Sequence, residues 1–243
     1  MTTQLHRTES DPIKPLTDVT GLLVGVVGGT GPQGRGLAVR LAGAGQRVLL
    51  GSRDAERAAA VAKEVAERAA GVAAEGIDVS VGGCSNLEAA GEADVVIIAV
   101  PFAAHADTLA EVAGALAGKV VIDCAVPMAF DKQGAYALDV PEGSVAQQAA
   151  ALLPDSVVVG AFHHLSAVLL EDLAHSLEGD VLVVGDDRAA TDTVQALAGR
   201  LPGMRGVYAG RLRNARQVEA LTINLVSINR RYKVHAGVRI TDV

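Results

Sequence analysis

Three glycines at fixed spacing form the strongest chemical signal in the sequence. Gly29, Gly31 and Gly34 follow a short β-branched run in the pattern Gly-x-Gly-x-x-Gly. In a dinucleotide site such glycines permit a tight turn, close approach of the backbone to a pyrophosphate, and close packing of the following helix. N–H groups at the start of that helix then receive the phosphate charge. The spacing alone also fits an ordinary glycine-rich turn, but its place between a strand and a helix favours a dinucleotide site.

The end of the second expected strand indicates which dinucleotide binds. NAD sites usually place Asp or Glu there to hold the ribose hydroxyls, and that carboxylate would repel a 2′-phosphate. Here Ser52 takes the position, Arg53 follows, and Arg57 lies one helical turn later. A hydroxyl and two guanidinium groups favour NADP. The alternatives are that both arginines form a solvated pair and that Asp54 only caps the next helix.

Two histidines and two aspartates further along could also do chemistry. His163 and His164 follow a later apolar run, where either could act as a general acid or base, donate a hydrogen bond to a substrate, or lie at the surface. No carboxylate partner is evident for them, so no catalytic residue is predicted. Asp186 and Asp187 resemble a metal-binding pair, but a Gly-Asp-Asp turn before a helix is more typical of an N-cap. No metal site is predicted.

These residues need a layered scaffold, and the sequence predicts one. From Gly21 onward, short β-branched runs alternate with longer Ala-rich amphipathic stretches, which is typical of repeated βα units. The expected strands are 22–27, 47–51, 78–82, 94–100, 119–124, 156–161 and 180–184. The expected helices are 34–44, 54–70, 85–90, 104–117, one ending near 200, and about 213–234. The loops at 99–102 and 123–127 should line the cofactor crevice at the carboxyl edge of the sheet.

The predicted fold class is α/β, a Rossmann doubly wound parallel sheet with a smaller C-terminal α/β domain. Residues 1–20 are polar, contain Pro12 and Pro15, and are expected to form a flexible tail. Residues 21–165 should form the NADP-binding domain, and residues 166–243 the smaller domain.

Composition restricts the partners and the compartment. The formal net charge of −7 argues against nucleic acid as a partner. No apolar run approaches the roughly 18 residues needed to span a bilayer, and the N-terminus lacks a secretory apolar region, so a cytoplasmic protein without membrane contact is expected. Cys84 and Cys124 show no metal-ligand spacing and are expected to be reduced, buried small side chains.

Several segments together resemble a known family, the NADPH-dependent reductases of coenzyme F420, a deazaflavin carrier. The matching segments are 28–36, 51–53 with Arg57, 100–101, 126–127, 161–163, 185–187 and 212–222. The resemblance extends over nearly the whole chain from Gly21. It implies hydride transfer between the nicotinamide ring of NADP(H) and the central ring of F420, held face to face in a homodimer.

The resemblance also implies roles for individual residues. Thr30, Gly31, Pro32 and Gln33 would hold the pyrophosphate, and Ser52, Arg53 and Arg57 the 2′-phosphate. Phe102 and Ala106 would flank the adenosine, and Ala167 would approach the nicotinamide. The deazaflavin would lie near His163, Leu165, Thr222 and Ala236, with the C-terminal segment closing the site. His164 departs from the family pattern, which has a small hydroxyl residue there.

Charge near the C-terminus agrees with an anionic ligand. Seven basic residues follow residue 210, against Glu219 and Asp242 only: Arg211, Arg213, Arg216, Arg230, Arg231, Lys233 and Arg239. This cluster suits the phosphate and carboxylates of the F420 tail, and it also fits a solvated helix face or a subunit contact.

Two other functions stay open from the residues alone. One is an NADP-dependent imine or keto-acid reductase using His163 or His164 as proton donor, and the other is a non-catalytic NADP(H)-sensing module.

Overall fold

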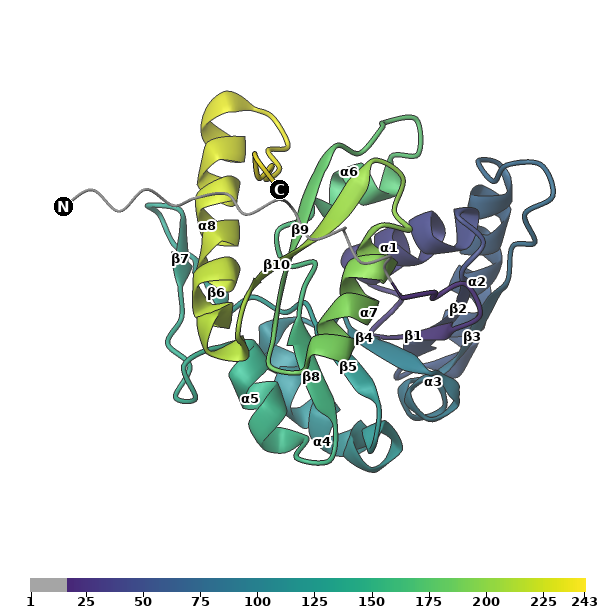
Figure 1. The fold of residues 1–243 in the computed structure, drawn as a ribbon, viewed down its shortest axis with the longest axis horizontal. Coiled ribbons are helices and arrows are strands. Elements are labelled where there is room, and N and C mark those ends of the chain that lie inside the picture. Colours follow the sequence, from purple (N-terminus) through teal and green to yellow (C-terminus); the bar gives the residue numbers. More distant parts are fainter. Residues whose placement is uncertain (1–16) are drawn as a thin grey trace, which may run out of the picture.

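A computed structural model of the protein describes residues 17–243, and an eight-stranded sheet with helices on both faces dominates it (Figure 1). Most of the predicted tail therefore lies outside the described residues. The strands of the sheet are β1 (Leu23–Val27), β2 (Arg47–Ser52), β3 (Val81–Ser85), β4 (Val95–Ile98), β5 (Val120–Asp123), β8 (Val157–Gly160), β9 (Gly179–Gly185) and β10 (Met204–Gly210). Their order is β10-β9-β8-β5-β4-β1-β2-β3, and every neighbouring pair is parallel except β8 with β9. The predicted α/β class with a doubly wound Rossmann sheet is confirmed.

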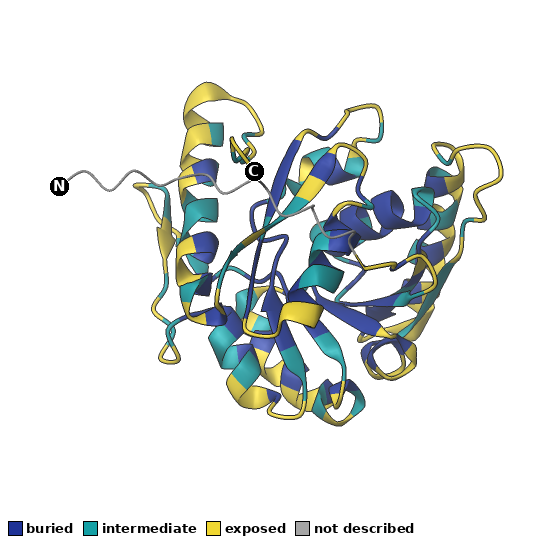
Figure 2. Cartoon of the chain, in the orientation of Figure 1, coloured by how far each residue is buried: buried dark blue, intermediate teal, exposed yellow. Residues whose placement is uncertain are grey.

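Two apolar layers cover the sheet. Residues of α1, α2, α6 and α7 form one buried cluster, and residues of α3, α4, α5 and the start of α8 form the other. The central strands β1, β4, β5 and β8 are buried except for the first residue of β1, β5 and β8, whereas α8 alternates buried and exposed positions (Figure 2). The helices are α1 (Pro32–Gly43), α2 (Ala55–Ala70), α3 (Asn86–Glu92), α4 (His105–Leu116), α5 (Val145–Leu152), α6 (Ala167–Glu171), α7 (Arg188–Ala198) and α8 (Ala215–Tyr232).

The antiparallel pairing of β8 with β9 shapes the carboxyl edge of the sheet. Because Gly160 pairs with Val184, residues 179–183 of β9 continue past the end of β8. The sheet thus runs across the boundary predicted near residue 165, and the division into two domains stays a prediction. The pair β6 (Met128–Phe130) and β7 (Ala135–Ala137) forms a separate antiparallel hairpin that packs along α8 at one side of the molecule (Figure 1).

The observed elements differ from the predicted ones at several places. The strand expected at 78–82 begins at Val81, because β2 pairs with it only from Val48 to Ser52. The next helix starts at Asn86, since Ser85 caps it in a reciprocal pair with Glu88. The sequence analysis missed the β6–β7 hairpin, α5, α6 and β10, which are short or interrupted by glycine. Among the helices of the described residues, none is long and apolar enough to cross a membrane.

Candidate functional site

The glycine-rich turn after β1 has the geometry of a phosphate cradle. Gly28 carries the left-handed backbone angle, φ +74°, one residue earlier than the pattern suggested. A Cβ on Gly34 would lie 2.7 Å from the Cα of Gly29, so only glycine permits this approach of α1 to the strand. Gly31 caps α1 with no side-chain hydrogen bond, and the first turn has no acidic residue. The N–H groups there are left to receive an anion.

A cavity of about 420 Å³ opens beside this turn. Five of the predicted NADP-binding residues line it: Thr30, Gly31, Ser52, Arg53 and Arg57. Asn86 also lines it and accepts a hydrogen bond from the N–H of Gly28 at 3.0 Å, a contact that the sequence analysis missed. The capping pair Ser85 and Glu88 marks the start of that helix, and it is the signal that could have placed Asn86. Phe102 and Ala106 do not line the cavity, whereas their neighbours Pro101 and Ala104 do.

The end of β2 is organised to present positive charge. Ser52 is buried and accepts a hydrogen bond from the N–H of Asp54 at 3.2 Å. The Asp54 carboxylate accepts from the N–H of Arg57 at 3.0 Å and so caps α2, as the alternative interpretation of Asp54 proposed. Its charge is thereby engaged by the helix terminus, while the exposed guanidinium groups of Arg53 and Arg57 remain to meet a phosphate. The donor set fits a 2′-phosphate.

Gln33 joins the glycine-rich turn to the end of β8. Its Nε2 donates to the carbonyl of Phe162 at 3.1 Å. Phe162 is fully buried and holds a left-handed backbone angle, φ 63°, which is strained for a bulky residue. Pro32 is the first residue of α1. The side chain of Gln33 therefore fixes the segment that carries His163 and Leu165.

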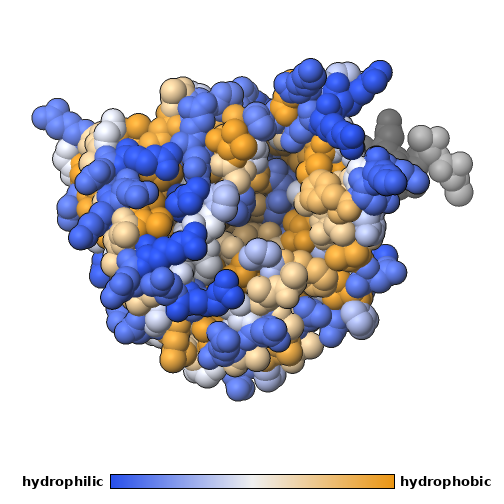
Figure 3. Space-filling model, turned by 180° about the vertical axis from the view of Figure 1, so that it is seen from behind, coloured by the Kyte–Doolittle hydropathy of each residue, from blue (hydrophilic) through white to orange (hydrophobic). Residues whose placement is uncertain are grey.

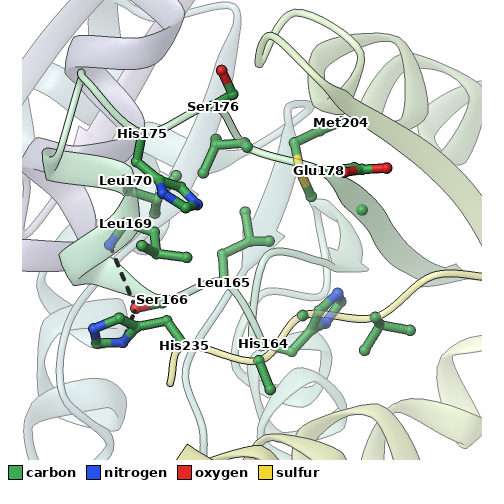
Figure 4. A pocket seen from close by; sticks show the side chains of 15 residues that line it. His164, Leu165, Ser166, Leu169, Leu170, His175, Ser176, Glu178, Met204 and His235 are labelled. Carbon is green, nitrogen blue, oxygen red and sulfur yellow. Dashed lines mark hydrogen bonds between the residues drawn. The ribbon is translucent and has the colours of Figure 1, made fainter. Parts of the chain in front are cut away.

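A second cavity, of about 230 Å³, lies between the segment after β8 and the C-terminal residues (Figure 4). Leu165 and Ala236 line it, and Ala167 begins α6 directly after the lining residue Ser166. Ser166 Oγ and His235 Nδ1 are 3.3 Å apart, and the two side chains lie side by side in the close view. Of the predicted deazaflavin residues, only Leu165 and Ala236 are brought together here.

The C-terminal residues reach this cavity because Asp180 at the start of β9 holds them. Its backbone N–H donates to the carbonyl of Val238 at 2.8 Å, and its carboxylate accepts from the N–H of Ile240 at 2.6 Å and from Arg205 at 2.7 Å. The carbonyl of Asp180 accepts from Nε2 of His164 at 2.8 Å. His164 is thus tied to the backbone.

His163 and Thr222 are buried polar groups without a hydrogen-bond partner among the described residues. Neither ring nitrogen of His163 has a partner, and neither does the hydroxyl of Thr222. Burial lowers the pKa of His163 to about 4, although the charge of Asp123 opposes the effect. Burial also lowers the pKa of His164. Both rings are therefore neutral at neutral pH, which is unfavourable for an imidazolium proton donor.

A cluster of buried polar residues lies under the carboxyl edge, and the sequence analysis missed it. His105 at the start of α4 and Asp123 at the end of β5 are fully buried, with Nε2 and Oδ2 2.5 Å apart. The other nitrogen of His105 lies 3.3 Å from Oε1 of Gln148. Glu219 of α8 is 1% exposed and accepts from the N–H groups of Val145 and Ala146, both at 3.1 Å. No sequence spacing links these residues, because four different elements contribute them.

The charges in this cluster depend on one another. Burial disfavours a charged His105, but its hydrogen bond to Asp123 and the charge of that carboxylate outweigh burial and raise its pKa. Burial raises the pKa of Glu219 to about 7, against the opposing effect of the two backbone hydrogen bonds. Within the cluster, Glu219 thus titrates near neutral pH.

The remaining candidate residues are a helix cap, two cysteines and two arginines of α8. Asp187 accepts from the N–H of Ala190 at 2.8 Å and caps α7, as predicted. Cys124 is buried as expected, whereas Cys84 is only partly buried. Burial raises the pKa of the Cys84 thiol to about 11 and that of Cys124 still further. Arg230 and Arg231 line a cavity between α8 and the hairpin. Residues 17–243 contain no group of acidic, His and Cys side chains suited to hold a metal.

Seen from the side opposite Figure 1, the surface is hollowed, and hydrophobic and weakly polar residues line the hollow (Figure 3). Such a hollow can take an apolar or weakly polar part of a ligand.

Several known proteins similar to this chain carry the description of one family. Residues 23–127 match the family described as "NADP oxidoreductase coenzyme F420-dependent". The chain is 41% identical over 225 residues to the F420-dependent NADP reductase of Methanothermobacter marburgensis, covering 90% of this chain and 98% of the relative. It is 36% identical over 223 residues to the F420-dependent NADP reductase of Methanocaldococcus jannaschii, covering 90% of this chain and 98% of the relative. A solved structure from Arthrobacter sp. FB24, provisionally described as an F420-dependent NADP-reductase, has a TM-score of 0.71 at 25% identity, covering 91% of this chain and all of that one.

Proposed function

Because the chain belongs to the family of F420-dependent NADP reductases, we propose that it transfers hydride reversibly between NADP(H) and coenzyme F420. The observation that carries the proposal is the 41% identity that spans 98% of the archaeal reductase, so both halves of the site are included. An imine or keto-acid reductase is not favoured. It would need a proton donor at the substrate, and the two candidate histidines are buried and neutral at neutral pH.

Residues 21–165 are proposed to bind NADP(H). Thr30, Gly31 and the first turn of α1 with Pro32 and Gln33 would hold the pyrophosphate, and Ser52, Arg53 and Arg57 the 2′-phosphate. The glycine contacts and the arginine-lined cavity support this assignment. Phe102 and Ala106 would flank the adenosine from the start of α4, beside Ala104, which lines the same cavity.

Residues 166–243 are proposed to close the deazaflavin site. His163, Leu165, Thr222 and Ala236 would contact F420, and Ala167 would approach the nicotinamide. The support is the cavity that Leu165 and Ala236 share, together with the ring nitrogens of His163 and the hydroxyl of Thr222, which are buried and have no partner among the described residues. Arg230 and Arg231 would attract the anionic F420 tail.

When bound, NADPH supplies the hydride and F420 accepts it. The residues of this chain have to bind, orient and exclude water, because hydride transfer between two stacked rings depends on proximity and alignment more than on a nucleophile. A neutral His163 fits such a role, since it can donate or accept one hydrogen bond without changing its charge.

A homodimer and a cytoplasmic location complete the proposal. Large hydrophobic side chains are exposed on the hairpin and along α8, including Phe130 at 65% and Tyr232 at 70%. A second copy of the chain would cover this face, and patches of this kind mark interaction sites. Sedimentation of the purified protein would measure the oligomeric state.

The direct test mixes purified protein with NADPH and oxidised F420 and follows the deazaflavin absorbance. We expect F420 to be reduced, and we expect NADPH to stay unoxidised with simple keto acids or imines. Rising salt should raise the KM for F420, because exposed charges are screened within about 8 Å at physiological ionic strength. NADPH binding without any F420 reduction would instead indicate a sensing module.

A further inference from the structure

Glu219 ties α8 to the dinucleotide-binding layer. Its Oε2 accepts from the N–H of Val145, and its Oε1 from the N–H of Ala146, each at 3.1 Å. These are the first two residues of α5, so the carboxylate lies on the positive end of that helix. The carboxylate is buried, and a buried hydrogen bond to a charged group is stronger and more sensitive to geometry than a surface contact.

Two charged groups from other elements act on Glu219. His105 of α4 and Asp123 of β5 both act on it electrostatically, in opposite directions. His105 has two acceptors, Asp123 Oδ2 and Gln148 Oε1, and the Gln148 amide in turn donates to Glu142 at 3.3 Å. An imidazole between two acceptors is favoured in its cationic form. The raised pKa of His105 favours a positive charge beside these carboxylates. Hydrogen bonds link α4 with β5 and α5, and Glu219 links α8 with α5.

The position of α8 matters for the proposed site because Thr222 follows Glu219 by three residues, on the same face of the helix. The hydroxyl of Thr222 and both ring nitrogens of His163 are among the buried polar atoms of the described residues that have no hydrogen-bond partner. We propose that Glu219 is a positioning residue for hydride transfer: seated on the first two amides of α5, it fixes α8 and thereby the place of Thr222 relative to the segment after β8. The inference rests on the proposed function for the identity of the reactants.

Amide exchange and kinetics of a Glu219→Gln variant test this proposal together. Gln keeps the shape but offers one acceptor and one donor to two N–H groups, so one contact becomes repulsive. In the ligand-free protein we expect at least one of the amides of Val145 and Ala146 to exchange about tenfold faster, because Gln leaves that amide without an acceptor. The kcat should fall on the order of 10- to 100-fold through misplacement, with the KM for NADPH unchanged.

The matched control is Glu111→Gln, the same substitution at an exposed position of α4. It should leave exchange and kcat unchanged. If Glu219→Gln does not fold, Glu219→Asp retains the charge on a shorter side chain and should show an intermediate increase in exchange. Unchanged exchange would overturn the proposal, and so would faster exchange with an unaltered kcat, since Glu219 would then be only structural. A wild-type protein with slow exchange at both amides that does not reduce F420 would overturn the proposed function instead.

Discussion

The phosphate cavity and the buried cluster at α8 are built in opposite ways. The cavity is open, and the predicted phosphate-binding residues in it come from two strand ends that are close in sequence: Thr30 and Gly31 follow β1, and Ser52, Arg53 and Arg57 lie at or after the end of β2. The cluster is buried, and His105, Asp123 and Glu219 come from elements up to 114 positions apart in the sequence. Local turn and helix geometry places the first set, whereas only the packed fold places the second. We therefore expect the cavity to decide which cofactor binds, and the cluster to decide how well the second half of the site is aligned.

The largest expected effect is on cofactor choice. Arg53→Glu should weaken NADPH binding by about 1.5 to 3 kcal/mol, on the order of 10- to 100-fold, because a charge-assisted contact to the 2′-phosphate is replaced by repulsion. NADH binding should change little. Calorimetry with both nucleotides measures this difference, and Arg47→Glu at the opposite end of β2 is the control. Equal losses for the two nucleotides would mean that Arg53 does not contact the phosphate.

The next effect is on the pH dependence of stability, and it arises from Glu219 in the buried cluster. The pKa of Glu219 is about 7 in the folded protein, against an ordinary value of 4.5, so the folded state holds more protons than the unfolded state between these values. The contribution of Glu219 to the free energy of unfolding is therefore present at low pH and lost as pH rises through about 7. Between pH 4.5 and 8, the free energy of unfolding of the wild type should fall by about 2 to 3 kcal/mol relative to that of Glu219→Gln. Urea denaturation across this pH range measures this difference. Parallel pH profiles for the wild type and the variant would show that the pKa of Glu219 is not raised in the folded protein.

The same contrast explains how much could be predicted from the sequence. The alternation of strands and helices, the cradle at Gly31 and the charges at Arg53 depend on local pattern, and the predicted elements there agree with the structure to within a few residues. The caps at Asp54 and Asp187 were also foreseen, because capping depends on neighbours along the chain. The pairing of β9 with β8 and the contact of Glu219 with α5 were not foreseen, since each depends on a tertiary arrangement that no short spacing records.

A smaller effect is expected at His163. His163→Ala should reduce the rate of hydride transfer by about tenfold through lost positioning, because an aromatic hydride acceptor needs no proton at the moment of transfer. Single-turnover measurements would give this rate, and thermal unfolding would show how far the cavity left by the ring affects stability. A loss beyond about four powers of ten would exceed ordinary general acid–base contributions and would assign His163 an essential proton.

The smallest effect separates a ligand contact from a packing role at Thr222. Its hydroxyl is buried and has no partner within the described residues, so it carries a desolvation cost that no hydrogen bond offsets. Thr222→Val removes the hydroxyl at similar shape and should raise the free energy of unfolding by about 1 kcal/mol. The same substitution should raise the KM for F420 a few-fold and leave that for NADPH unchanged, if the hydroxyl meets the deazaflavin. Thr193→Val on the exposed side of α7 is the control, because its hydroxyl already donates to the carbonyl of Ala189 at 2.9 Å. A stabilised variant with unaltered F420 kinetics would show that Thr222 only packs, and the alignment of the second half of the site would then depend on the backbone of α8 rather than on this side chain.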